Sequence, residues 1–250
     1  MNNWKRTSAL LVGIATLFGC VTVTENEQNV QSDPVSMAES RIALGLGYLE
    51  QDNMVRAYDN LQQALSHAPR YYRAQLSMAH YYEVVGEKTK AEAMYRRALQ
   101  QHSNNGNVLN NYGTFLCKQG DYEKADKMFN RAINQPYYYL ISASYENAAF
   151  CALKAQKEEM AAHYFTRAID YDPNRPKSIL QLASLKIDQH QFTDARRQLL
   201  RFHQMYGPQI SSLQLLIRLE QSAGNQTLQE NYQQQLELLK ATREKANNRP

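Results

Sequence analysis

Glycine and proline are scarce in this 250-residue chain, which holds 10 of the first and 7 of the second. Because both residues interrupt helices, their scarcity and regular placement favour a helical domain. Charge is also close to balanced, with 28 basic and 24 acidic residues, and two of the basic residues lie in the N-terminal leader. Nucleic-acid-binding proteins concentrate basic side chains on one face, so no nucleic-acid partner is expected.

Motifs for chemistry are missing as well. The sequence has no phosphate-binding glycine loop and no Gly-x-Ser-x-Gly elbow. Its six histidines are scattered, and none has a partner at metal-ligand spacing on one helix face. We therefore expect no catalytic residue, no metal and no enzymatic activity.

The apolar run from Thr7 to Phe18 is too short to anchor the chain in a bilayer, because a spanning helix needs roughly 20 residues. Lys5 and Arg6 precede the run, and Gly19-Cys20 ends it, an order typical of an export signal. An ordinary signal peptide with an incidental cysteine is one interpretation.

The ending LFGC resembles the bacterial lipobox, in which a small residue precedes a cysteine that is acylated and becomes the mature N-terminus. The resemblance implies a signal peptide over residues 1–19 and a covalent lipid on Cys20 as the only added group. Val21 stands where an aspartate would retain enteric lipoproteins in the inner membrane. The expected location is thus the periplasmic face of the outer membrane.

Residues 21–37, VTVTENEQNVQSDPVSM, are polar and poor in aromatic side chains. Such a segment buries too little apolar surface to fold alone, so residues 20–37 are predicted to be the acylated cysteine and a flexible tether. The folded domain is predicted over residues 38–243 and a disordered tail over residues 244–250.

Four segments of this domain repeat one pattern: VRAYDNLQQAL (55–65), TKAEAMYRRAL (89–99), EKADKMFNRAI (123–133) and EMAAHYFTRAI (159–169). In each, alanine, a large apolar residue and a second alanine stand at i, i+4 and i+7, which is one face of a helix. The first alanines are spaced 34, 34 and 36 residues apart, at Ala57, Ala91, Ala125 and Ala161. The repeat is therefore a structural unit rather than a local coincidence.

A second amphipathic helix precedes each copy and carries a small residue where the two helices cross, at Gly45, Ala79, Gly113 and Ala149. This helix-turn-helix unit resembles the tetratricopeptide repeat. The resemblance implies an all-α fold, a right-handed superhelix (α-solenoid) of about six repeats whose last, degenerate copy caps the stack. The predicted repeats are about 38–71, 72–105, 106–141, 142–175, 176–209 and 210–243.

The 36-residue step holds a two-residue insertion around Gln135-Pro136-Tyr137-Tyr138-Tyr139. It either lengthens a loop or presents a tyrosine patch to a partner, because aromatic side chains favour interfaces.

The stretches NNYGTFLC, KQGDYEKA and AAFCALKA, with the opening RIALGLGYLEQDNMVRAYDNLQQAL, resemble the type IV pilus biogenesis lipoproteins of the PilF/PilW type. The resemblance extends from the lipobox to about residue 206. It implies a pilotin, an adaptor that binds the secretin subunit and promotes its outer-membrane localisation and multimerisation, or a role in pilus stability and twitching motility. The implied partners are the secretin, the outer membrane and the lipoprotein sorting machinery.

Two cysteines remain in the mature domain, Cys117 and Cys151, on successive first helices. An even pair in an oxidising compartment favours a disulfide, and members of the resembling family also have this pair. Two buried free thiols are the alternative, and two isolated cysteines do not support a metal site.

Repeat register predicts a partner-binding groove on the first helices, where apolar side chains could receive a helix or hydrophobic segment. Its predicted residues are Ile42, Leu46, Leu49, Arg73, Leu76, His80, Asn110 and Thr114.

Two other functions are compatible with the sequence. One is a tetratricopeptide lipoprotein that organises enzymes of cell-wall synthesis or hydrolysis. The other is an enzyme with Cys117 as nucleophile, which would need a free thiol of low pKa and a nearby histidine. A monomer is the expected state.

Overall fold

The computed structural model describes residues 33–247, and these fold into a succession of twelve α-helices. The signal peptide, Cys20 and most of the predicted tether lie outside the described residues. The helices are α1 (Pro34–Glu50), α2 (Met54–His67), α3 (Tyr72–Val84), α4 (Lys88–Gln101), α5 (Gly106–Lys118), α6 (Tyr122–Ile133), α7 (Ile141–Lys154), α8 (Glu158–Tyr171), α9 (Pro176–Asp188), α10 (Phe192–Tyr206), α11 (Ile210–Ser222) and α12 (Gln226–Asn247).

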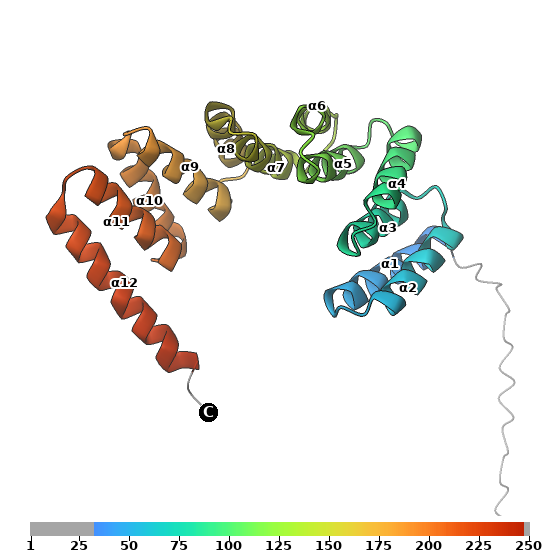
Figure 1. Cartoon of the computed structure of the whole chain (residues 1–250), viewed down its shortest axis with the longest axis horizontal. Coiled ribbons are helices and arrows are strands. Elements are labelled where there is room, and N and C mark those ends of the chain that lie inside the picture. The colour runs from blue at the N-terminus through green and yellow to red at the C-terminus, as the bar shows by residue number, and fades with distance from the viewer. Residues whose placement is uncertain (1–32, 248–250) are drawn as a thin grey trace, which may run out of the picture. The chain divides into compact units, whose positions relative to one another are not determined.

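Consecutive helices pack as pairs, from α1 with α2 to α11 with α12, and each pair also contacts the next one along the chain (Figure 1). Residues from Pro34 onward form one compact unit. The described part of the chain contains no strand, so the predicted all-α repeat fold is confirmed. None of its helices has the length and apolar character needed to cross a bilayer.

The alanine pattern of the second helices lies at the centre of each pair. A fifth copy of the pattern, with Ala195 and Leu199, lies on α10. The first alanine of all five copies is fully buried, and so is the second alanine in the four copies that carry it. The large residue between them is also buried, with at most 3% of its surface exposed. These large residues are Leu61, Tyr95, Phe129, Phe165 and Leu199.

Small residues on the first helices make room for these large side chains. A Cβ atom added to Gly45 would lie 2.6 Å from Leu61 Cγ, and one added to Gly113 would lie 2.9 Å from Phe129 Cε1. Both distances are below van der Waals contact, so the facing side chain or its helix would have to shift. The crossing points predicted from the sequence are therefore sterically fixed in these two repeats.

The turn inside each repeat uses one residue in the left-handed region. Its φ lies between +56° and +84° in all six repeats, at Asp52, Gly86, Gly120, Gln156, His190 and Gly224. The next residue's N–H donates back to the last turn of the first helix, as from Asn53 to the Tyr48 carbonyl at 2.9 Å. Glycine takes this position without strain in three repeats, whereas the other three hold a residue with a Cβ there.

Both predicted ends of the domain need correction. Helix α1 begins at Pro34 rather than at residue 38, because proline at the first turn of a helix loses no hydrogen bond and has a suitable φ. Helix α12 continues to Asn247, so residues 244–247 are helical where a disordered tail was predicted.

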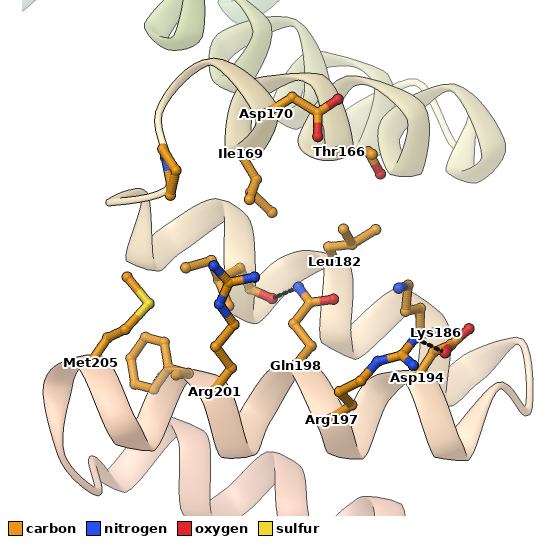
Figure 2. A pocket seen from close by; sticks show the side chains of 13 residues that line it. Thr166, Ile169, Asp170, Leu182, Lys186, Asp194, Arg197, Gln198, Arg201 and Met205 are labelled. Atoms are coloured by element: carbon orange, nitrogen blue, oxygen red, sulfur yellow. Dashed lines mark hydrogen bonds and ion pairs between the residues drawn. The ribbon is translucent and has the colours of Figure 1, made fainter.

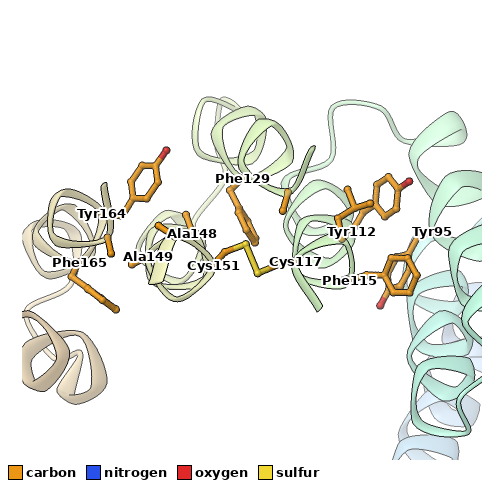
Figure 3. Packing of buried hydrophobic residues seen from close by; sticks show 14 of the residues in the cluster. Tyr95, Tyr112, Phe115, Cys117, Phe129, Ala148, Ala149, Cys151, Tyr164 and Phe165 are labelled. Carbon is orange, nitrogen blue, oxygen red and sulfur yellow. A yellow bond between two sulfur atoms is a disulfide. The ribbon is translucent and has the colours of Figure 1, made fainter. Parts of the chain in front are cut away.

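The buried centre of the domain joins repeats two to five and contains the two cysteines (Figure 3). Cys117 on α5 and Cys151 on α7 form a disulfide, with their Cα atoms 5.8 Å apart. Both residues are buried. The Cys117 sulfur is therefore not a free thiolate, and the disulfide links repeat three covalently to repeat four.

Two glycines on the same helix test the helix crossing. Gly45→Ala should lower the free energy of unfolding by about 1–2 kcal/mol, because overpacking costs about 1–3 kcal/mol against a helix-propensity gain of about 1. Gly47 has no atom within 4 Å of an added Cβ, so Gly47→Ala should raise it by about 1 kcal/mol. Urea unfolding of both variants measures the difference. Equal stabilisation by both substitutions would contradict a tight crossing at Gly45.

The disulfide generates a second prediction. Closing a loop of about 35 residues stabilises a fold by about 3.8 kcal/mol in the chain-entropy model, so Cys117→Ala/Cys151→Ala should lose about that amount. Thermal unfolding with and without reductant measures it: reductant should lower the Tm of the wild type and leave the double variant unchanged. A wild-type Tm insensitive to reductant under conditions that reduce the bond would contradict the predicted stabilisation.

Candidate functional site

A hollow of about 450 Å³ lies among the first helices of repeats one to three. Helices α1, α3 and α5 contribute to it, together with one residue of the loop that precedes α7. We call it the N-terminal groove. Its lining residues are Leu46, Tyr72, Arg73, Leu76, Ser77, His80, Asn107, Asn111 and Tyr139.

Repeat register explains this lining. Arg73 on α3 and Asn107 on α5 stand 34 residues apart, as do Ser77 and Asn111, so equivalent positions of successive first helices point to the same side. Four of the predicted groove residues are part of the lining: Leu46, Arg73, Leu76 and His80.

Two predicted residues on α1 are instead core residues. Ile42 is 2% exposed and packs with the alanines of α1, α2 and α3, and Leu49 is 7% exposed. Apolar residues recur every three or four positions on α1 and form one face of this helix. Both α2 and α3 pack against α1 and cover that face. Only Leu46, which is half-buried, lies at the edge of that face and reaches the groove.

Asn110 and Thr114 on α5 also lie outside the groove lining. The Asn110 side-chain oxygen accepts hydrogen bonds from Ser144 Oγ at 3.0 Å and Asn147 Nδ2 at 3.1 Å, both on α7. Thr114 Oγ1 donates to the Asn110 carbonyl oxygen at 3.0 Å. This side of α5 thus faces the next repeat, and Asn107 and Asn111 take the groove positions.

The inserted tyrosines divide into one core residue and two exposed ones. Tyr138 is buried against Gly106, whose added Cβ would lie 2.4 Å from the tyrosine ring, and its hydroxyl bonds Ser144 Oγ at 3.0 Å. Burial raises the pKa of Tyr138. Tyr137 has a φ of +61° and is fully exposed, and this turn directs Tyr139, 81% exposed, to the groove. The insertion therefore supplies an aromatic side chain to the groove.

One side of the groove has a fixed charge. Arg73 Nη1 lies 2.7 Å from Glu39 Oε1, and the Tyr71 hydroxyl donates to the same carboxylate oxygen. Burial disfavours the guanidinium charge, but the Glu39 carboxylate together with Tyr71 and Tyr72 outweighs burial and raises the pKa of Arg73. Burial, reinforced by Glu39, also raises the pKa of Tyr71. Arg73 is therefore charged and held in place, while half of its side chain stays exposed.

These groups suit recognition of a polypeptide. Leu46, Leu76 and Tyr139 offer apolar and aromatic contacts, and the amides of Asn107 and Asn111 can bond a peptide backbone. The lining includes neither a carboxylate nor a thiol. Within residues 33–247, no three histidine, cysteine, aspartate or glutamate side chains gather as a possible metal site.

Sequence comparison finds related proteins. A tetratricopeptide-repeat family model matches residues 94–127. The type IV pilus assembly protein PilF of Pseudomonas aeruginosa is 34% identical over 206 residues, which is 81% of either chain. An uncharacterised protein of Haemophilus influenzae is 34% identical over 163 residues, covering 65% of this chain and 89% of its own.

Structure comparison agrees. The solved structure of Pseudomonas aeruginosa PilF superposes with a TM-score of 0.71 at 32% identity, covering 82% of this chain and 93% of its own. The structure of PilW, described as a widely conserved type IV pilus biogenesis factor, shares the fold with a TM-score of 0.69 at 24% identity, covering 80% and 92%. The repeat fold and the identity to PilF over four-fifths of both chains lead to one conclusion: this chain belongs to the PilF/PilW-type family of tetratricopeptide-repeat proteins of type IV pilus biogenesis.

Proposed function

We propose that this chain is a pilotin, an outer-membrane lipoprotein that binds the type IV pilus secretin subunit through the N-terminal groove. The observation that carries the proposal is the groove itself, whose lining combines Leu46, Leu76 and Tyr139 with amide and guanidinium groups. Solenoid repeats bind partners through such surfaces of their first helices, and a mixed apolar and polar lining suits a peptide segment.

The anchoring step rests on the lipobox resemblance of LFGC. A diacyl-type lipid on Cys20 would hold the adaptor at the periplasmic face of the outer membrane, since two or more acyl chains give stable membrane attachment. The lipoprotein sorting machinery would carry adaptor and bound secretin subunit there together. Concentrating subunits at one membrane favours their multimerisation.

A gene deletion tests the anchored adaptor. Deletion should remove detergent-resistant secretin multimers from the outer membrane, or leave them in the inner membrane, because unanchored subunits are not delivered. Wild type should restore them and Cys20→Ala should not, as measured by blotting separated membrane fractions.

Each other outcome of the deletion has a defined meaning. Correctly placed multimers with lost pili would replace the pilotin role by pilus stabilisation. Normal multimers and normal pili, with defects in envelope shape, would favour the scaffold for cell-wall enzymes. Restoration by Cys20→Ala equal to wild type would contradict the need for the lipid.

Groove variants test the binding site directly. Leu46→Glu/Leu76→Glu should abolish co-purification of the secretin subunit, because two carboxylates would be desolvated against an apolar partner surface. Leu44→Glu/Leu238→Glu, at leucines that are 49% and 69% exposed outside the groove, has the same charge and should bind as wild type. Circular dichroism verifies that all variants are helical. Undiminished capture by the folded groove variant would contradict the assignment.

A second pair of variants, with smaller expected effects, alters the segment Tyr137–Tyr139, which we call the tyrosine loop. Tyr139→Ala should weaken secretin binding about tenfold, since an aromatic anchor at an interface contributes about 1–2 kcal/mol. Tyr137→Asn alters the neighbouring fully exposed tyrosine, outside the groove lining, and should leave affinity unchanged. Equal affinities for both variants, measured by titration of the purified secretin subunit, would exclude Tyr139 from the interface.

A further inference from the structure

A second hollow, of about 470 Å³, lies far along the chain from the N-terminal groove (Figure 2). Its walls are α8 and α10, the second helices of repeats four and five, and α9 lies between them. We call it the α8–α10 cleft. It shares no residue with the N-terminal groove.

The floor of the cleft is apolar. Ile169 of α8 faces Leu182 of α9 across the cleft, and Met205 closes one end from α10 (Figure 2). Leu182 and Phe202 are buried, whereas Met205 is 39% exposed. The hollow lined by α6, α7 and α8 measures only about 10 Å³ and shares no lining residue with the cleft. The α8–α10 cleft is therefore much the larger of these two hollows.

The charges around this floor do not cancel. Asp170 pairs with Arg167 at 3.1 Å and Asp194 pairs with Arg197 at 2.5 Å, so both carboxylates of the lining already have an arginine. Lys186 and Arg201 also line the cleft, and the structure of residues 33–247 gives neither of them an ion pair. Two positive charges thus remain beside an apolar floor.

Polar groups in the lining match a peptide backbone. Gln198 Nε2 donates to the Ile179 carbonyl at 2.7 Å, which fixes the amide and leaves its side-chain oxygen as an acceptor (Figure 2). Thr166 Oγ1 donates to the Ala162 carbonyl at 2.8 Å, so its oxygen can also accept. A peptide has N–H donors for both acceptors, whereas the acyl chain of a lipid has none.

We propose that the α8–α10 cleft is a second docking site, which takes an acidic peptide segment of a protein partner. A large apolar side chain of the segment would lie on Ile169, Leu182 and Phe202. Its carboxylates would pair with Lys186 and Arg201, and its backbone would bond Gln198. This site is separate from the N-terminal groove, and the proposal does not depend on what the N-terminal groove binds.

The test is a selection from a displayed library of random dodecapeptides on the immobilised wild-type protein. Counter-selection uses Lys186→Glu/Arg201→Glu, which reverses the two unpaired charges. The matched control is Lys177→Glu/Arg243→Glu, with the same change of charge at exposed residues outside the cleft lining. Circular dichroism verifies that both variants are helical.

The proposal expects enriched peptides that combine aspartate or glutamate with a large apolar residue. They should bind the control as tightly as wild type and the cleft variant at least tenfold more weakly. They should also shift the methyl NMR resonance of Met205. Basic peptides, an absence of enrichment over counter-selection, or equal binding to the cleft variant would overturn it.

A titration with the same NMR readout distinguishes a lipid ligand from a peptide ligand. Short-chain phosphatidylglycerol is titrated against the protein with the Met205 methyl resonance as readout. The proposal expects no shift below the concentration at which this lipid forms micelles. A saturable shift at lower concentration, together with displacement of the selected peptide, would assign the cleft to an anionic lipid and overturn the peptide site.

Discussion

The close approach of the two helices inside each repeat is the constraint on which the rest of the structure depends. Gly45 against Leu61 and Gly113 against Phe129 leave no space for one additional methyl group. The second helices carry fully buried alanines, whose small side chains permit neighbouring helices to pack closely. Since each repeat of a solenoid contacts only its neighbours, a displaced second helix would shift every following pair. The groove positions on α1, α3 and α5 coincide only because these distances are kept.

The repeated helix pairs could be predicted from the sequence because several segments carry the same alanine pattern at a common spacing. The fully buried first alanines are an example: each copy alone is a weak signal, and their common spacing is a strong one. The turns were less visible. Asp52, Gln156 and His190 adopt the left-handed conformation that glycine adopts in the other repeats. Aspartate and histidine are enriched in this conformation, but most residues of either type do not adopt it, so the residue type alone does not predict the turn.

The groove was predictable only in part, for geometric reasons. Ile42, Leu46 and Leu49 are all apolar and lie on one helix, and burial depends on which neighbouring helix covers each of them. Asn110 and Asn111 are neighbouring residues of the same type, but Asn110 faces α7 and accepts a hydrogen bond from Ser144 Oγ, whereas Asn111 lines the groove. The path of the tyrosine loop, reversed by the positive φ at Tyr137, could not be read from three consecutive tyrosines.

The disulfide connects the fold to the proposed binding site. The chain segment that it closes, from Cys117 to Cys151, contains the tyrosine loop and therefore Tyr139. Tyr138 holds the same loop from inside through Gly106 and Ser144. A loop that is held by both the disulfide and the packing of Tyr138 loses little conformational entropy when a partner binds, which favours affinity. The N-terminal groove and the α8–α10 cleft are built from different helices, so the two proposed sites could be occupied at once.

Site-specific photo-crosslinking in living cells tests the central claim, that the N-terminal groove holds the secretin, most directly. A photoreactive phenylalanine analogue is placed at position 139, in the groove, and in a second strain at position 137, the exposed neighbour outside its lining. The proposal predicts a crosslink to the secretin subunit from position 139 and little or none from position 137. Equal crosslinking from both positions, or a secretin crosslink from position 205 in the α8–α10 cleft and none from position 139, would contradict it.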